Sequence, residues 1–167
     1  MKNTGVTTFA RRRALAKEKS RVGALRFRLY KHCYQRVDQA LDAGYHLEAI
    51  ALLESMISDR LESRLAFLAQ TDFSFKTLGA LINKARAAEC DPELRVLVIE
   101  KLPVWSKNRN EAIHEMAKLA DGDTDGWEAR QLKNSQFARD GLALLRKLDS
   151  RVKRLRKPIT QSTRSGL

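Results

Sequence analysis

The chain has 167 residues, of which 43% are hydrophobic and 31% are charged. This length suits a single domain with a buried core. No apolar run is long enough to span a membrane, and the N-terminus lacks the apolar stretch of a secretory signal. We therefore expect a cytoplasmic protein without membrane contact.

The net charge of +12 lies at the two ends of the chain. Residues 1–31 carry +9 and residues 146–167 carry +7, whereas residues 32–145 carry −4. Basic ends of this kind attract polyanions, nucleic acid first among them. The alternative interpretation is that they are solvated helix faces and tails.

The chain contains only two cysteines, Cys33 and Cys90. They have no CxxC spacing and no clustered histidines nearby. This pattern predicts neither a metal site nor a disulfide framework, and it favours a reducing compartment.

A polar, disordered start is expected over residues 1–8, followed by a helix from about residue 9 to 41. Whether this helix breaks near Gly23 stays open. Asp42-Ala43-Gly44 ends it, with Gly44 as a left-handed cap. Its apolar stripe has helical spacing and consists of Leu25, Leu29, Tyr30, Cys33, Val37 and Leu41.

The second helix, about residues 45–70, is the clearest element. Glu54 falls inside its apolar arc, whereas the neighbouring acids Glu48, Asp59 and Glu62 are expected to face solvent. An acid in an apolar stripe needs a cation or a hydrogen-bond partner. The stripe consists of Leu47, Ile50, Leu53, Ile57, Leu61, Leu65 and Leu68.

Shorter helices are expected next. One covers about residues 74–88. Asp91-Pro92 then predicts a helix start, with Asp91 as N-cap and Pro92 in the first helical position. We expect that short helix to span residues 92–101 and to end before Pro103.

Residues 104–108 are expected to begin the next helix, which reaches about residue 120 and is followed by a loop over residues 121–126. The last predicted helix covers residues 127–156 and ends before Pro158. Its apolar positions are Leu132, Phe137, Leu142, Leu145, Leu148, Val152 and Leu155.

Nothing in the sequence reads as a strand or an internal repeat. Five or six helices with short connections predict an all-α, antiparallel helical bundle. We expect a basic N-terminal segment over residues 1–22, partly disordered or helical, a bundle over residues 23–157, and a disordered tail over residues 158–167.

The segment Arg109-Asn110-Glu111-Ala112-Ile113-His114 carries the clearest chemistry. Histidine suits proton transfer near neutral pH. Asn110 and His114 are four residues apart and share a helix face, whereas Arg109 and His114 lie about 140° apart around the axis. For Arg109 to reach the same phosphate, it must sit in an irregular first turn, or a second subunit must complete the site.

An Arg-Asn-x-x-x-His segment in a late helix, after a long amphipathic helix pair, resembles the HEPN superfamily. Many of these dimerising helical bundles are metal-independent endoribonucleases, with a signature of Arg, four to six residues, then His. Arg109, Asn110 and His114 match this signature, and the bundle-like layout of about residues 24–156 is compatible with it. The spacing alone is weak, because Arg26 and His32 share it.

The resemblance implies that His114 acts as general base or general acid and that Arg109 binds the scissile phosphate. Asn110 would orient the histidine or the phosphate. Glu54, which corresponds to an acid on the second long helix of many members, would hold Arg109 or a neighbouring cation. No metal or cofactor is implied.

Lys107 and Asn108 are candidates to bind flanking phosphates of RNA, or they are solvated helix residues. His32 and His46 are expected to have no catalytic role. The implied partners are RNA, a second copy of the chain in a homodimer, and an antitoxin or nucleotidyltransferase.

Three functions follow from the sequence. The first is a metal-independent endoribonuclease that cleaves RNA through 2′-OH attack, in host defence, a toxin–antitoxin system or RNA processing. The second is a non-catalytic helical module that binds RNA or protein. The third is a DNA-binding mobile-element accessory protein that uses the basic ends.

Overall fold

The computed structural model describes residues 21–69, 76–114, 116, 118 and 126–156, and no strand occurs among them. The predicted all-α helical bundle is confirmed. The described helices are α2 (Arg21–Asp42), α3 (His46–Ala69), α4 (Leu78–Ala88), α5 (Pro92–Val96), the π-helix η1 (Leu97–Lys101), α6 (Leu102–His114) and α7 (Trp127–Arg156).

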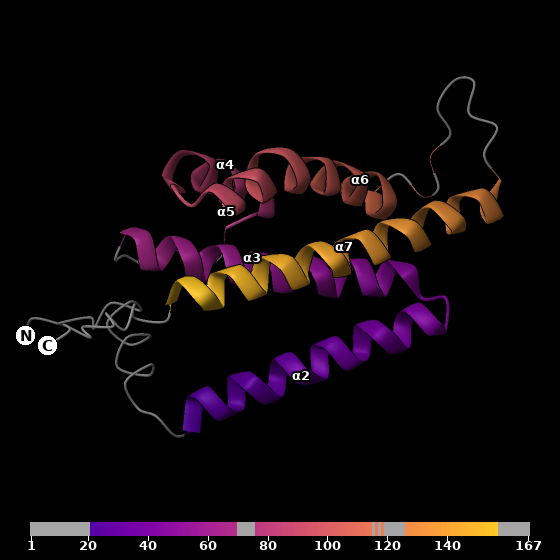
Figure 1. Cartoon of the computed structure of the whole chain (residues 1–167). Helices are drawn as coiled ribbons and strands as arrows, with labels where there is room; N and C mark the ends of the chain where they lie inside the picture. The colour runs from indigo at the N-terminus through magenta and orange to yellow at the C-terminus, as the bar shows by residue number, and fades with distance from the viewer. Residues whose placement is uncertain (1–20, 70–75, 115, 117, 119–125, 157–167) are drawn as a thin grey trace, which may run out of the picture.

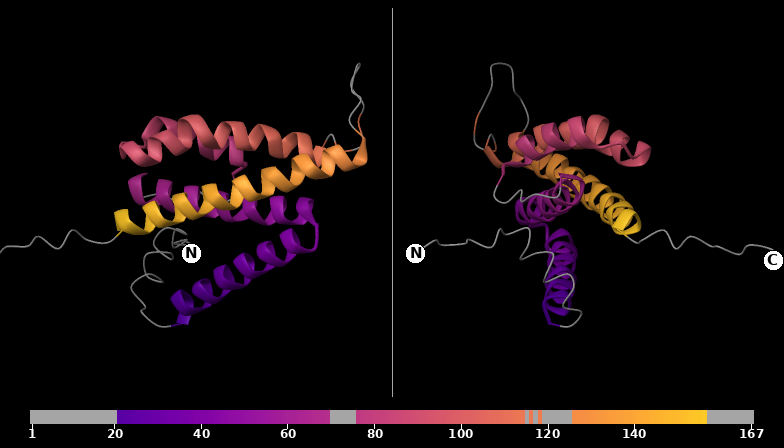
Figure 2. Two further views of the ribbon diagram at one scale, coloured as in Figure 1. Left: turned by 45° about the vertical axis from the view of Figure 1, so that its right-hand side comes forward. Right: turned by 90° about the vertical axis from the view of Figure 1, so that its left-hand side faces the viewer.

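The helices form three tiers. Helices α3 and α7 lie side by side in the middle, α2 lies on one side of them, and α4, α5 and α6 lie on the other (Figures 1 and 2). Consecutive helices α2 and α3 are antiparallel, whereas α3 and α7 run in the same direction (Figure 1). Within the described part of the chain, no helix combines the length and apolarity needed to cross a membrane.

The predicted domain limits fall mostly outside the described residues. The disordered tail over residues 158–167 and residues 1–20 of the basic N-terminal segment lie there, whereas Arg21 and Val22 belong to α2. Gly23 does not break α2.

Helix α2 ends as predicted, because Gly44 has a φ of 78° and follows the last helical turn. The predicted stripe is wrong at Leu25 and Leu29, which are exposed. The first half of α2 contacts α3 through polar side chains instead: Arg26 and Tyr30 both bind the Asp59 carboxylate. These contacts turn the two leucines outward.

Helix α3 is the centre of the core, and the middle of its predicted stripe, from Ile50 to Leu65, is buried. The expectation that Asp59 faces solvent is wrong, because its carboxylate binds α2. The apolar pattern also did not reveal that Arg60 and Arg64 are buried. Each has a carboxylate partner, which offsets the cost of burying its charge.

Helix α4 begins at Leu78, later than predicted; residues 70–75 lie outside the described residues. The Thr77 hydroxyl accepts a hydrogen bond from the Ala80 N–H at 3.3 Å and thereby caps the helix. The predicted start at Asp91-Pro92 is confirmed, because the Asp91 carboxylate accepts from the Leu94 N–H at 3.0 Å.

The predicted break before Pro103 is wrong. Residues 92–114 are helical throughout, and the π-helix η1 lies immediately before Pro103. In η1 the Leu102 N–H donates to the Leu97 carbonyl, five residues back. Pro103 has no backbone N–H to donate to a helical hydrogen bond. The wider turn of η1 shifts the hydrogen-bond register just before this residue, so the helix continues through it.

Helix α6 ends at His114, earlier than predicted, and both Met116 and Lys118 are non-helical. Their carbonyls accept hydrogen bonds from the Arg130 side chain on α7, at 3.3 and 3.0 Å. These two carbonyls therefore bond to a side chain of α7 and not to the backbone N–H groups of a longer α6. Residues 119–125, including most of the predicted loop, lie outside the described residues.

Helix α7 has the predicted bounds, and its apolar positions from Leu142 to Val152 are buried. The prediction is wrong at Leu132, which is exposed. The close approach of α6 to α7 depends on Gly141, which faces the indole of Trp105. The indole N–H donates to the Phe137 carbonyl at 3.0 Å, so this contact fixes α6 on α7.

We expect Gly141→Ala to destabilise the protein by about 1–2 kcal/mol, although alanine favours helix over glycine. A β-carbon at this position would lie 2.5 Å from the indole nitrogen of Trp105. Gly79→Ala is the control, because nothing lies within 4 Å of its added carbon. Urea unfolding should show Gly79→Ala to be neutral or stabilising; equal behaviour of the two variants would contradict the packing.

Buried and half-buried ion pairs join α3, α4, α5 and α7. Arg64 donates two hydrogen bonds to the Glu89 carboxylate, at 2.7 and 2.8 Å, and Arg151 donates to Asp91 at 2.9 Å. Burial tends to raise the pKa of Glu89, but the hydrogen bonds from Arg64 and the Asp91 N–H outweigh it and lower that pKa. Arg151 lowers the pKa of Asp91.

These lowered pKa values predict that the protein loses stability in acid. Carboxylates whose pKa is lower in the folded than in the unfolded state stabilise the fold above their unfolded values, and that contribution disappears as the pH falls through the folded values. We expect a constant Tm from about pH 7 to 5 and a decline below about pH 4. Asp91→Asn should lower Tm at neutral pH and decline less in acid; a constant Tm down to about pH 3 would contradict this assignment.

Candidate functional site

Arg109 lies in the middle of α6 and points toward α3. Its guanidinium Nη2 forms an ion pair with the Glu54 carboxylate, and the two side chains are 14% and 25% exposed. Burial lowers the pKa of Arg109, but a guanidinium remains charged at neutral pH. Glu54, the acid in the apolar stripe, therefore has a cation partner.

Asn110 continues this cluster on the exposed side. Arg109 Nη1 donates to the Asn110 Oδ1 at 2.5 Å. The contacts of Arg109 therefore lie on both sides of its guanidinium, with a carboxylate toward the core and an amide toward solvent. Its Nε is buried and has no hydrogen-bond partner among the described residues. The guanidinium is held in one orientation before any ligand arrives.

His114 is the last residue of α6 and is exposed. Asn110 precedes it by one helical turn, so the two share a face of α6. Arg109 is five residues before His114 in a regular helix, and the two directions differ by about 140°. Within one chain, Asn110 therefore shares a helix face with His114 and accepts a hydrogen bond from Arg109. Arg109 and His114 themselves point to different faces of α6.

The expectation that Arg109 sits in the first turn of a helix is wrong. Helix α6 begins at Leu102 and continues directly from η1. The backbone N–H groups near Arg109 thus take part in helical hydrogen bonds and cannot bind a phosphate. Since the histidine ends the helix, the segment lies at a C-terminal end instead.

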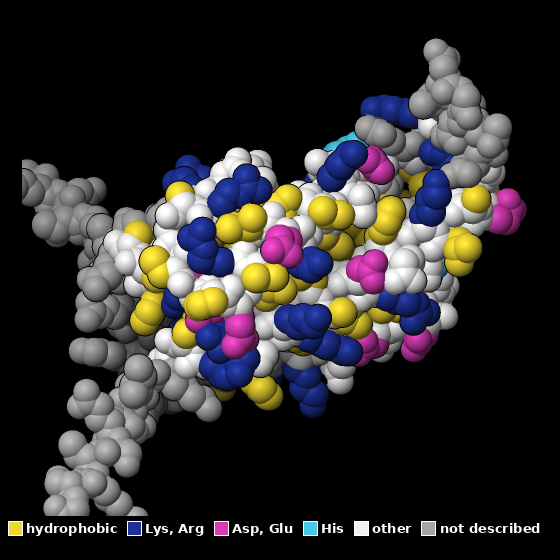
Figure 3. All heavy atoms as spheres, turned by 45° about the horizontal axis from the view of Figure 1, so that its top comes forward, with side chains coloured by type: hydrophobic (Ala, Val, Ile, Leu, Met, Phe, Trp, Pro, Cys, Tyr) yellow, Lys and Arg dark blue, Asp and Glu magenta, His cyan; other side chains and the backbone are white. Residues whose placement is uncertain are grey.

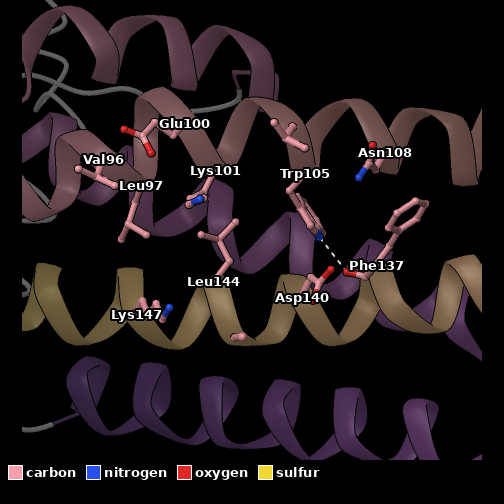
Figure 4. A pocket seen from close by; sticks show the side chains of 12 residues that line it. Val96, Leu97, Glu100, Lys101, Trp105, Asn108, Phe137, Asp140, Leu144 and Lys147 are labelled. Atoms are coloured by element: carbon pink, nitrogen blue, oxygen red, sulfur yellow. Dashed lines mark hydrogen bonds between the residues drawn. The ribbon is translucent and has the colours of Figure 1, made fainter.

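Lys107 and Asn108 diverge from each other. Lys107 is exposed and lies 3.8 Å from the Glu111 carboxylate, one turn ahead. Asn108 lines a groove of about 480 Å³ between η1–α6 and α7, together with Trp105 and Phe137 (Figure 4). Figure 3 shows hydrophobic side chains interspersed with charges of both signs on this face of the molecule.

The other two histidines have different surroundings. His32 is exposed on α2, and Arg26, its partner in the alternative Arg–His spacing, forms an ion pair with Asp59 at 2.6 Å. His46 is the first residue of α3, and its Nδ1 is buried without a hydrogen-bond partner among the described residues. Neither lies beside an arginine that is oriented as Arg109 is.

The described residues contain no group of three His, Cys, Asp or Glu side chains that could hold a metal ion. Cys33 and Cys90 are free thiols.

The sequence reasoning missed two side chains that position this segment. Trp105, one turn before Arg109, fixes α6 on α7, and Arg130 binds the carbonyls just after His114. The signal for the first was Gly141, a glycine in the middle of a long helix, which often marks a close approach of a neighbouring group. No signal in the sequence pointed to Arg130.

Comparisons with known proteins found no family model, no curated protein and no solved structure that matches this chain.

Proposed function

We propose that this protein is a HEPN-like, metal-independent endoribonuclease whose site contains Arg109, Asn110 and His114. The single observation that carries the proposal is the fixed guanidinium of Arg109, held by Glu54 and Asn110 five residues before an exposed histidine. A held cation and an accessible proton-transfer group are the two parts that cleavage of a phosphodiester needs.

In the proposed reaction the ribose 2′-oxygen attacks the adjacent phosphorus and the bond from phosphorus to the 5′-oxygen breaks. A histidine takes the proton from the 2′-OH, and a second proton donor protonates the departing 5′-oxygen. Arg109 stabilises the additional negative charge on the phosphoryl oxygens in the transition state. The products are a 2′,3′-cyclic phosphate and a free 5′-OH.

A second copy of the chain supplies the missing part of the site. Because Arg109 and His114 diverge around the axis of α6, one copy cannot direct both at one phosphate. A two-fold symmetric dimer that brings two α6 ends together would present two histidines, one as base and one as acid.

The test is an assay of purified full-length protein on RNA in the presence of a metal chelator. We expect cleavage that persists in the chelator and yields 2′,3′-cyclic phosphate ends. Products with a 5′-phosphate, or activity that the chelator abolishes, would contradict the proposal.

One observation favours the non-catalytic RNA-binding alternative. The Glu54 carboxylate already neutralises Arg109, and loss of one partner of such a pair leaves an uncompensated charge, so the arginine also fits a structural role without catalysis. RNA that is bound in the assay above but stays intact would support this alternative.

A further inference from the structure

A cluster of cations lies at the end of the bundle opposite His114. The first turns of α2 and the last turns of α7 both lie at this end (Figure 1), and side chains from each reach α3. Arg26 and Tyr30 on α2 bind Asp59 on α3, and the guanidinium of Arg60 lies 3.9 Å from the centroid of the Tyr30 ring. Arg156 on α7 donates to the Ser63 carbonyl at 3.0 Å.

The carboxylates of this cluster do not balance its cations. Asp149 is shared, since it lies 2.6 Å from both Arg60 and Lys153. In the described part of the chain, the hydrogen bonds of Arg156 go to Ser63 alone, and the Asp59 carboxylate acts on its charge without forming a hydrogen bond to it. The cations are Arg26, Arg60, Lys153 and Arg156, and the carboxylates are Asp59 and Asp149.

The excess charge has an electrostatic cost. Burial, and then the positive charges of Arg26 and Arg60, lower the pKa of Arg156. Like charges that a fold holds together lose this repulsion when an anion binds between them. Arg26 and Arg156 are accessible to such an anion, because both side chains reach the surface.

An exposed aromatic residue follows Arg26 directly on α2. Phe27 is 71% exposed and stands between Arg26 and Arg28 in the sequence, and Lys31 is exposed one turn later. An aromatic face between cations suits single-stranded nucleic acid, in which bases stack on the ring and phosphates bind the cations. A free phosphate ion has no base that could stack on the ring.

We propose that Arg26, Arg156 and Phe27 form a second, non-catalytic binding site for single-stranded RNA. A backbone phosphate binds between the two arginines and a neighbouring base stacks on Phe27. The site rests on the proposed function only in the choice of RNA over DNA. It would retain a long RNA while the His114 end of the bundle acts on another part of it.

The test measures binding of a short single-stranded RNA to full-length protein that carries His114→Ala, so that the RNA stays intact. Fluorescence anisotropy at several salt concentrations gives the affinity and its salt dependence. We expect Arg156→Gln to weaken binding at least about fivefold and to reduce the salt slope by about 0.7, the value for one lost phosphate contact on a single strand. Phe27→Ala should weaken binding about fivefold or more and leave the slope unchanged.

Arg139→Gln is the matched control, because it removes the same charge from an exposed position on α7. Equal losses from Arg139→Gln and Arg156→Gln would overturn the proposal in favour of diffuse attraction. Full affinity in Phe27→Ala, whose exposed ring can be removed without unfolding the chain, would also overturn it.

Two further arms identify the ligand. Inorganic phosphate is tested for its effect on the Tm of the parent protein and of Arg156→Gln. If it raises only the parent's Tm, and Arg156→Gln leaves the RNA affinity unchanged, the site binds a small phosphate compound and the proposal is overturned. Equal competition by single-stranded DNA would contradict the choice of RNA. Because the RNA-binding measurements use inactive protein and the phosphate measurement uses no RNA, absence of cleavage in the parent does not affect these outcomes.

Discussion

Replacing His114 with alanine is expected to slow RNA cleavage by about 10²–10⁴-fold, the usual contribution of a general acid or base. The imidazole is exposed at the end of α6, so its removal should leave Tm unchanged. Arg109→Ala is expected to slow cleavage by about 10²–10³-fold, because the developing phosphoryl charge loses its cation.

Controls separate catalysis from folding. His32→Ala removes an exposed histidine from α2 and Arg139→Ala removes an exposed arginine from α7; both should retain full activity. Because Arg109→Ala leaves Glu54 without its partner, Arg109→Lys serves as a second variant that keeps the charge and loses the planar, forked donor geometry. Parent-like cleavage by a folded His114→Ala protein would exclude the proposed mechanism.

Glu89→Ala is expected to lower the free energy of unfolding by about 3–5 kcal/mol, because it leaves the buried guanidinium of Arg64 without a counter-charge. The Glu89 residue is 2% exposed, and its carboxylate also accepts a hydrogen bond from the Asp91 N–H at 2.9 Å. Urea unfolding monitored by circular dichroism measures the loss.

Glu93→Ala is the control, since this carboxylate binds Arg151 and Arg154 at the surface and should contribute less than about 1 kcal/mol. The double variant Arg64→Met, Glu89→Met should recover much of the loss, because it removes both charges together. A single Glu89→Ala variant as stable as Glu93→Ala would show that Arg64 finds another partner or water.

Much of the fold could be predicted because most of the core follows helical periodicity. The stripe of α3 and the bounds of α7 follow from the spacing of leucine, isoleucine and valine, and the turn at Gly44 follows from the need for a positive φ. These are local properties of the chain, so a single sequence contains them.

The errors arise where tertiary contacts override local preference. Leu25 and Leu29 have helical spacing but are exposed, because polar side chains make the contacts of the first half of α2. Leu132 has helical spacing too, yet it lies on an exposed face of α7. Arg60 and Arg64 are buried only because acids far along the chain meet them. Periodicity contains no information on such partners.

For the candidate site, the sequence predicted that Glu54 needs a cation partner, but it did not predict where Arg109 lies in its helix. An acid within an apolar stripe requires a cation, and Arg109 is that cation. The position of Arg109 in mid-helix could not be predicted, because Pro103 favours a break and only the π-turn of η1 removes it. That correction removes the helix N-terminus as a phosphate site and leaves the second copy of the chain as the way to complete the site.

The most direct test of this composite site is a mixing experiment. Parent protein and His114→Ala protein are unfolded together in equal amounts, refolded so that subunits combine at random, and assayed for RNA cleavage in chelator. If each site needs a histidine from both copies, about a quarter of the parent activity should remain, because about a quarter of the dimers contain two parent chains. Retention of about half, as in samples refolded separately, would show that one histidine is enough for each site and would contradict the account.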